Sequence, residues 1–163
     1  MDAMTDDRRN DAVSLAQHAV RLEGLFDRRI AGILHAHGIS RGELDVLRAL
    51  ASGDPAGARP GELSSRLLLT TGGLSNILRR LQADGLIERQ HDLSDARSHR
   101  VQLTPQGRAL AREAGQAAAV AMSDALVSVD PSVLRAAAQS LHEVLVALGE
   151  DGAVHLDPTR PAG

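Results

Sequence analysis

The stretch that decides the fold is Thr70–Leu103, TTGGLSNILRRLQADGLIERQHDLSDARSHRVQL. Its first half has apolar residues at helical spacing behind a threonine that can cap a helix, and Gly85 is a typical stop signal. Its second half holds two partly alternating segments, 86–90 and 99–103, on either side of a polar run, 91–98. We therefore predict a helix to about Ala83, followed by a β-hairpin with a polar tip.

A shorter helix is predicted immediately before this stretch. Pro60 suits the first turn of a helix that runs to about Leu68. A break of about 3–4 residues then separates it from the next helix, which is the spacing of a helix-turn-helix motif. With the hairpin that follows, this order predicts a winged helix-turn-helix.

Longer helices are predicted on both sides of this region. Apolar residues recur at helical spacing from about Asp11 to Ala36. Ser40 and Glu43 form a capping-box pattern that opens another helix, to about Ser52. Thr104-Pro105 and Asp130-Pro131 each resemble a helix start. The predicted fold class is therefore mainly α with a small β-wing (α+β), with additional helices at both ends of the chain.

Charge is distributed unevenly along the chain, although the overall net charge is only −3. Residues 59–112 hold nine Arg and five acidic residues, a net charge of +4, whereas the rest holds nine Arg and sixteen acidic residues, a net charge of −7. A basic segment inside an acidic chain favours local binding to phosphates.

Several classes of protein are disfavoured by composition. The 163 residues include no Cys, which excludes disulfides, iron–sulfur clusters and thiol chemistry. No apolar run approaches the ~20 residues of a membrane span, and the acidic N-terminus does not resemble an export signal, so we expect a cytoplasmic protein without membrane contact. We expect no enzyme activity, because no phosphate loop, metalloprotease motif or nucleophile elbow occurs.

The helix over residues 71–83 has the pattern of a DNA-reading helix. At 100° per residue, its leucines and Ile77 form one buried stripe. The opposite side is polar, basic and free of acids, and Asn and Arg can read base edges in a major groove. The predicted contacts of this helix with DNA are Thr71, Gly72, Ser75, Asn76, Arg79 and Arg80.

The hairpin offers a second set of predicted DNA contacts. Asp95 and Arg97 are two residues apart, so in a strand they lie on one side, and the carboxylate can orient the guanidinium. A guided arginine at a wing tip suits a narrow minor groove, where the potential is most negative. Arg100 on the second strand is predicted to reach phosphate.

Taken together, these motifs resemble the MarR family of bacterial transcription regulators. The resemblance covers about residues 40–112 and rests on three runs: the helix ending RLQADGLIER over 80–89, the Asp-x-Arg of the wing, and VQLTPQG over 101–107. The family usually has Asp-Arg-Arg at the wing, whereas this chain has Ala96 in place of the first Arg.

The resemblance implies a homodimer on double-stranded DNA, with two winged domains reading a pseudo-palindromic operator, and repression is the expected outcome. It divides the chain into a flexible N-terminus (1–10), a dimerisation helix (11–38), the winged helix-turn-helix region (39–104), two dimerisation helices (105–149) and a loose tail (150–163).

Family members often respond to a small anionic or phenolic effector in a crevice beside the dimer helices. Near that crevice we expect Arg28, Arg29, His35 and Arg48. No cofactor or metal ion is predicted, since none of the seven His are paired at i, i+4. Two alternatives stay open: a zinc-responsive regulator of the same fold with a site built across elements, and a winged-helix module that binds protein without binding DNA.

Overall fold

The computed structural model describes residues 3–92 and 95–150, and the side chains of residues 6–90 and 99–150. Within these ranges the chain forms six helices and one two-stranded antiparallel sheet: α1 (Ala3–Ala36), α2 (Arg41–Ala51), α3 (Pro60–Arg66), α4 (Thr71–Ala83), β1 (Ile87–Asp92), β2 (Asp95–Leu103), α5 (Pro105–Ala125) and α6 (Pro131–Ala147). This order confirms the predicted fold class. The predicted tail, apart from its first residue, lies outside the described residues.

The predicted helix starts are formed by side-chain caps. The Ser40 backbone N–H donates to Oε2 of Glu43 at 2.7 Å, and the Ser40 hydroxyl accepts from the Glu43 N–H at 3.3 Å, so the capping box is complete. Thr70 and Thr104 each accept from the backbone N–H three residues ahead, at 3.1 Å. These caps supply partners for N–H groups that have none inside the helix.

The junction between α4, the hairpin and α5 depends on two glycines. Gly85 has a φ of +69° just after α4, a backbone conformation that glycine adopts without steric cost. Gly107 lies in the first turn of α5, where a Cβ atom would lie 1.9 Å from the carbonyl oxygen of Leu86. The two glycines therefore let α5 begin directly against the base of the hairpin.

Three boundaries differ from those predicted. Helix α1 begins at Ala3 and not near Asp11, because its first turns are polar and carry no apolar stripe to reveal them. Helix α3 ends at Arg66, since Leu68 has a φ of +51° and cannot continue a helix. Strand β1 continues to Asp92 and strand β2 already begins at Asp95, so both strands reach further toward the tip than predicted. Backbone pairing in a hairpin does not require apolar side chains.

The hairpin is paired in one register from Ile87↔Leu103 to His91↔His99, with an irregularity before Asp92↔Asp95. At its base, Val101 also pairs with Ala58 in the loop between α2 and α3, with N···O distances of 2.8 and 3.0 Å. Val101 itself is fully buried. The base of the wing is thus attached to the rest of the winged domain.

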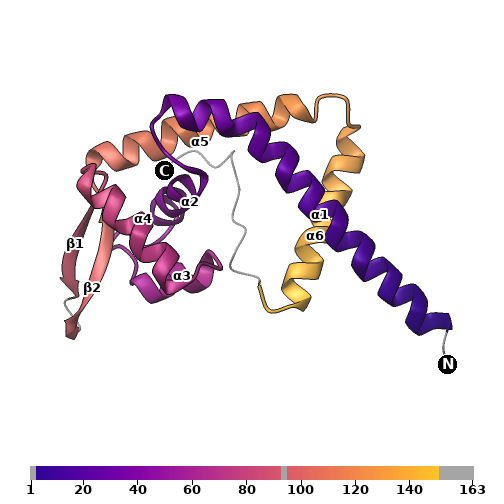
Figure 1. Cartoon of the computed structure of the whole chain (residues 1–163), viewed down its shortest axis with the longest axis horizontal. Coiled ribbons are helices and arrows are strands. Elements are labelled where there is room, and N and C mark those ends of the chain that lie inside the picture. The colour runs from indigo at the N-terminus through magenta and orange to yellow at the C-terminus, as the bar shows by residue number, and fades with distance from the viewer. Residues whose placement is uncertain (1–2, 93–94, 151–163) are drawn as a thin grey trace.

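The hydrophobic core lies in the winged domain. It is built by α2, α3, α4, the hairpin base, one face of α5 and the C-terminal part of α1, with Leu44, Leu47, Leu63, Leu78 and Leu81 among its most buried side chains. Figure 1 shows α5 leading from this domain, beside α1, to the opposite end of the molecule, where α6 lies. Helix α4, the predicted DNA-reading helix, is therefore fixed in a packed body.

The helices at the opposite end expose apolar side chains. Helix α6 has no buried residue along its length. Val20 of α1 is 70% exposed, Val133 of α6 is 57% exposed, and Leu148, just after α6, is 71% exposed. An unpaired apolar surface of this kind is typical of helices that pack on a partner. No helix in the described part of the chain is long and apolar enough to cross a membrane.

Candidate nucleic-acid interface

The two faces of α4 are as the sequence predicts. Leu74, Leu78 and Leu81 are buried, and Ile77 is partly buried. The other side of the helix is exposed and contains no acidic residue; it carries all six predicted contacts, Thr71, Gly72, Ser75, Asn76, Arg79 and Arg80. A polar helix face held rigidly by a buried opposite face is suited to enter a major groove.

Two of the predicted base-reading side chains are bonded to each other. Nη1 of Arg79 donates to Oδ1 of Asn76 at 3.0 Å. Because arginine has donors only, the Asn76 atom that faces it must be the amide oxygen, and the amide NH₂ is turned away. The pair therefore presents hydrogen-bond donors outward, which matches the acceptor-rich edge of guanine.

Arg80 has a partner that the sequence did not predict. Its Nε lies 3.2 Å from Oε1 of Glu43, which comes from the first turn of α2. The Arg80 side chain is 69% exposed, whereas that of Glu43 is only 3% exposed. The sequence pattern predicts only the capping role of Glu43. A signal was present, since Glu43 shares its helical face with Leu47 and Leu50, and an acid that is buried in an apolar stripe needs a partner for its charge.

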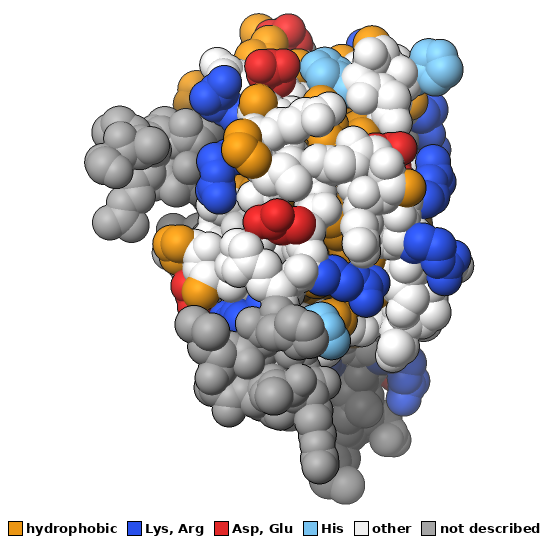
Figure 2. Space-filling model, turned by 90° about the vertical axis from the view of Figure 1, so that its left-hand side faces the viewer, with side chains coloured by type: hydrophobic (Ala, Val, Ile, Leu, Met, Phe, Trp, Pro, Cys, Tyr) orange, Lys and Arg blue, Asp and Glu red, His pale blue; other side chains and the backbone are white. Residues whose placement is uncertain are grey.

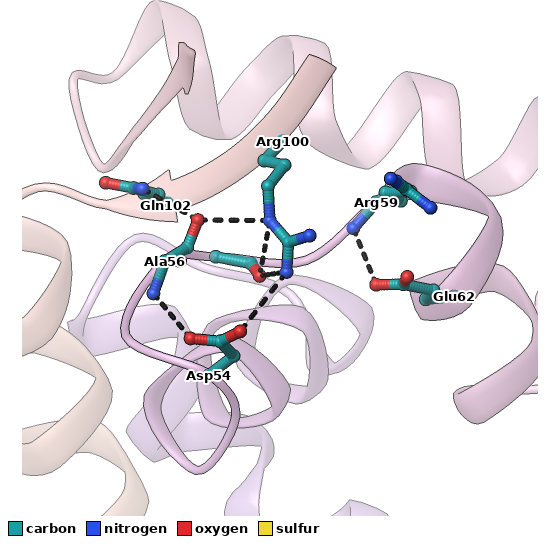
Figure 3. A network of polar contacts seen from close by, with 7 residues as sticks. Asp54, Ala56, Arg59, Glu62, Arg100 and Gln102 are labelled. Carbon is teal, nitrogen blue, oxygen red and sulfur yellow. Dashed lines mark hydrogen bonds and ion pairs between the residues drawn. The ribbon is translucent and has the colours of Figure 1, made fainter. Parts of the chain in front are cut away.

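At the base of the wing, Arg100 holds the loop between α2 and α3 (Figure 3). Its Nη2 donates to the Gly57 carbonyl at 2.6 Å, its Nε lies 3.2 Å from the Ala56 carbonyl, and Asp54 Oδ2 is 3.4 Å from Nη2. Gln102 donates to the same Ala56 carbonyl at 2.7 Å. These contacts place Arg100 as a brace between the wing and this loop. The phosphate contact of Arg100 stays a prediction.

The wing tip itself is described only as backbone. Residues 95–98 belong to β2, as the alternation of a strand requires, but the side chains of Asp95 and Arg97 lie outside the described residues. Their guided-arginine arrangement therefore stays a prediction. Figure 2 views the molecule from the wing side, where the blue side chains, all Arg because the chain has no Lys, are most numerous along the right-hand edge.

The four predicted effector residues lie on two helices. Arg28, Arg29 and His35 are exposed on α1, and Arg48 is half-buried on α2 with its Cδ beside Gly115 of α5. One open hollow on α1 is lined by Ala16, Gln17, Val20, Arg21, Gly24 and Arg28. Of the four predicted effector residues, only Arg28 lines this hollow. A lining that combines apolar side chains with arginines can hold a small anion that also has an apolar part.

Metal binding was the basis of one alternative. Among the described side chains, no three His, Asp or Glu residues gather closely enough to hold a metal ion. The predicted effector residue His35 is exposed in the last turn of α1, and His37 is bonded through Nδ1 to the Ile33 carbonyl at 2.8 Å. No observation in this part of the chain favours the zinc-responsive alternative.

The chain is similar in sequence and in fold to known proteins. Residues 37–98, from the end of α1 to the wing, match the model of the MarR family. A MarR family transcriptional regulator from Silicibacter pomeroyi is 29% identical, with a TM-score of 0.66 over 78% of this chain and 85% of the other. One from Methanosarcina mazei Go1 is 26% identical, with a TM-score of 0.72 over 83% of this chain and 95% of the other.

A third similar structure includes a ligand. CouR from Rhodococcus jostii RHA1, bound to p-coumaroyl-CoA, is 19% identical, with a TM-score of 0.70 over 99% of this chain and 100% of the other. At this identity the likeness concerns the fold alone. No protein with curated annotation matches the chain by sequence.

Proposed function

We propose that this chain, whose residues 37–98 match the model of the MarR family, is a winged helix-turn-helix transcription regulator of that family, and that it is a homodimeric repressor that recognises a pseudo-palindromic operator in double-stranded DNA. As such a regulator it would act in the cytoplasm of a bacterial cell. The observation that carries the proposal is the exposed, acid-free face of α4, with Asn76 and Arg79 joined on it and the wing braced beside it.

The proposed dimer is supported by the apolar surface at the end of the molecule away from the wing. Helix α6 and the N-terminal half of α1 expose side chains such as Val13 and Val133 to solvent. Burying such surface stabilises by about 25 cal/mol per Å². A two-fold dimer built on these helices would carry two winged domains on one side, so each α4 would enter a major groove one helical turn from the other.

We also propose that a small anionic effector releases the DNA. The hollow on α1 is lined by Arg21 and Arg28 together with Val20, which suits an organic anion. CouR, which shares the fold, binds p-coumaroyl-CoA, an anion with a phenolic end. The probe for this proposal is p-coumaroyl-CoA itself, added to the protein–DNA complex, with free coenzyme A as the matched control.

Footprinting after selection of genomic fragments tests the proposal. Fragments retained by the purified protein should contain two related half-sites about 10 base pairs apart, each protected in its major groove. Sedimentation of the free protein should give twice the chain mass. Fragments without any shared motif, or a monomer that protects one half-site, would contradict the proposed dimeric regulator.

A further inference from the structure

We propose that Glu43, in the first turn of α2, is a positioning residue for DNA recognition that acts through Arg80 of α4. The inference rests on the function proposed above and adds a residue that lies outside the reading helix. Glu43 is not expected to touch DNA, because its side chain is only 3% exposed. Its effect on DNA would pass through the guanidinium that it holds.

Both carboxylate oxygens of Glu43 have partners. Oε2 accepts from the backbone N–H of Ser40 at 2.7 Å, and Oε1 lies 3.2 Å from Nε of Arg80. A carboxylate that is almost fully buried is costly unless it is paired, so Arg80 is bound to this position much more firmly than a surface ion pair would bind it. The buried partner thus fixes an exposed arginine.

Helices α2 and α4 also lie in close contact beside this ion pair. A Cβ atom on Gly42 would lie 3.0 Å from Cδ1 of Ile77, so the first turn of α2 lies directly against α4 at this point. Ile77 is one turn before Arg80 on the same helix. The contacts of Gly42 with Ile77 and of Glu43 with Arg80 therefore add to the buried leucines in fixing the rotation of α4 about its own axis.

The geometry gives Arg80 a defined role. Its inner nitrogen, Nε, faces Glu43, and the side chain as a whole is 69% exposed, so the outer part of the guanidinium is open to a DNA phosphate or base edge. The nearby carboxylate also offsets the positive charge, which weakens attraction to phosphates at large. Arg80 should therefore add more to binding of the correct operator than to binding of arbitrary DNA.

The test is a double-mutant cycle measured on operator and scrambled duplexes. Glu43→Gln keeps the acceptor for the Ser40 N–H and the shape of the side chain but removes the charge that holds Arg80. We expect the ratio of operator affinity to scrambled affinity to fall about tenfold. Arg80→Gln should lower the same ratio, and the double variant should be no worse than the poorer single variant.

Glu62→Gln is the matched control, because Glu62 holds the same capping position in α3, accepting from the Arg59 N–H at 2.9 Å. It should leave the ratio unchanged. A Glu43→Gln protein that loses thermal stability but keeps the wild-type ratio would overturn the proposal, as would losses that multiply in the double variant. A wild-type protein that binds both duplexes equally would instead refute the proposed function, and this inference with it.

Discussion

Arg79 donates a hydrogen bond to Asn76 at 3.0 Å, so the two side chains predicted to read base edges are joined before any DNA arrives. Residues three apart on a helix are neighbours, and here that spacing links an arginine to an amide on the exposed face. The free amide donors of Asn76 and the remaining donors of Arg79 then form one unit. Preorganisation of this kind lowers the entropy cost of binding.

The Asn76–Arg79 pair should behave as a coupled reader. Asn76→Ala and Arg79→Ala should each cost about 1–3 kcal/mol on the operator and relax specificity at one base pair per half-site. Because the two side chains are bonded, the double variant should lose less than the two single losses combined. Binding to operators with single-base changes measures this. An equal loss on every sequence would count against direct reading by α4.

Arg97 at the wing should contribute affinity without sequence preference. Arg97→Ala should weaken binding to all duplexes and reduce the slope of log affinity against log salt by about 1. The control is Arg135→Ala, which removes the same charge from exposed α6, away from the proposed DNA contacts, and sedimentation checks that this variant is still a dimer. Salt titrations followed by anisotropy measure the slope. An unchanged slope for Arg97→Ala would remove the wing from the proposed contacts.

Arg100 should contribute more to the stability of the fold than to the electrostatic attraction between the protein and DNA. Its side chain is 22% exposed and its guanidinium is bonded to the loop at Asp54–Gly57, so Arg100→Gln should lower the free energy of unfolding by about 1–2 kcal/mol. The salt slope of DNA binding should stay as in the wild type. Thermal unfolding and salt titration separate the two effects. A smaller slope with unchanged stability would mean that Arg100 contacts phosphate, as the sequence had predicted.

Leu68 should be a site of backbone strain. It has a φ of +51° in the turn between α3 and α4, and its side chain is 75% exposed, so little burial is lost when it is removed. Leu68→Gly should raise the free energy of unfolding by about 1 kcal/mol, because glycine accepts this conformation without the Cβ clash. Leu68→Ala is the control and should change stability by under about 0.5 kcal/mol. Equal results for the two variants in chemical denaturation would argue against strain.

Gly107 should be required by packing. Gly107→Ala would place a Cβ atom 1.9 Å from the Leu86 carbonyl oxygen, between the start of α5 and the hairpin base. We expect a loss of about 3 kcal/mol in the free energy of unfolding. Gly61→Ala makes the same change in a helix where nothing lies within 4 Å, and it should be neutral or slightly stabilising. Urea unfolding of both variants checks the difference, and similar stabilities would refute the contact.

The sequence predicted the parts of the fold that depend on local chemistry. Helix caps such as Ser40 and Thr104 depend on side chains only a few residues apart, as does the leucine stripe of α4. These features can therefore be read from the local sequence. The start of α1 could not be placed, because an exposed polar helix lacks the periodicity that marks a buried face. The roles of Glu43 and Arg100 were missed for another reason: their partners are 37 and 43 residues away along the chain and meet them only after folding.

Sequence-specific binding is measured most directly by fluorescence anisotropy of the purified protein on the intergenic DNA next to its own gene. A scrambled duplex of the same length and composition is the comparison, and both are titrated from low to physiological salt. A dimeric, sequence-specific regulator should bind the intergenic duplex tightly, with one dimer per site, should bind the scrambled duplex much more weakly, and should lose affinity steeply with salt. Equally weak binding to the intergenic duplex, to the scrambled duplex and to fragments selected from the genome would contradict sequence-specific regulation.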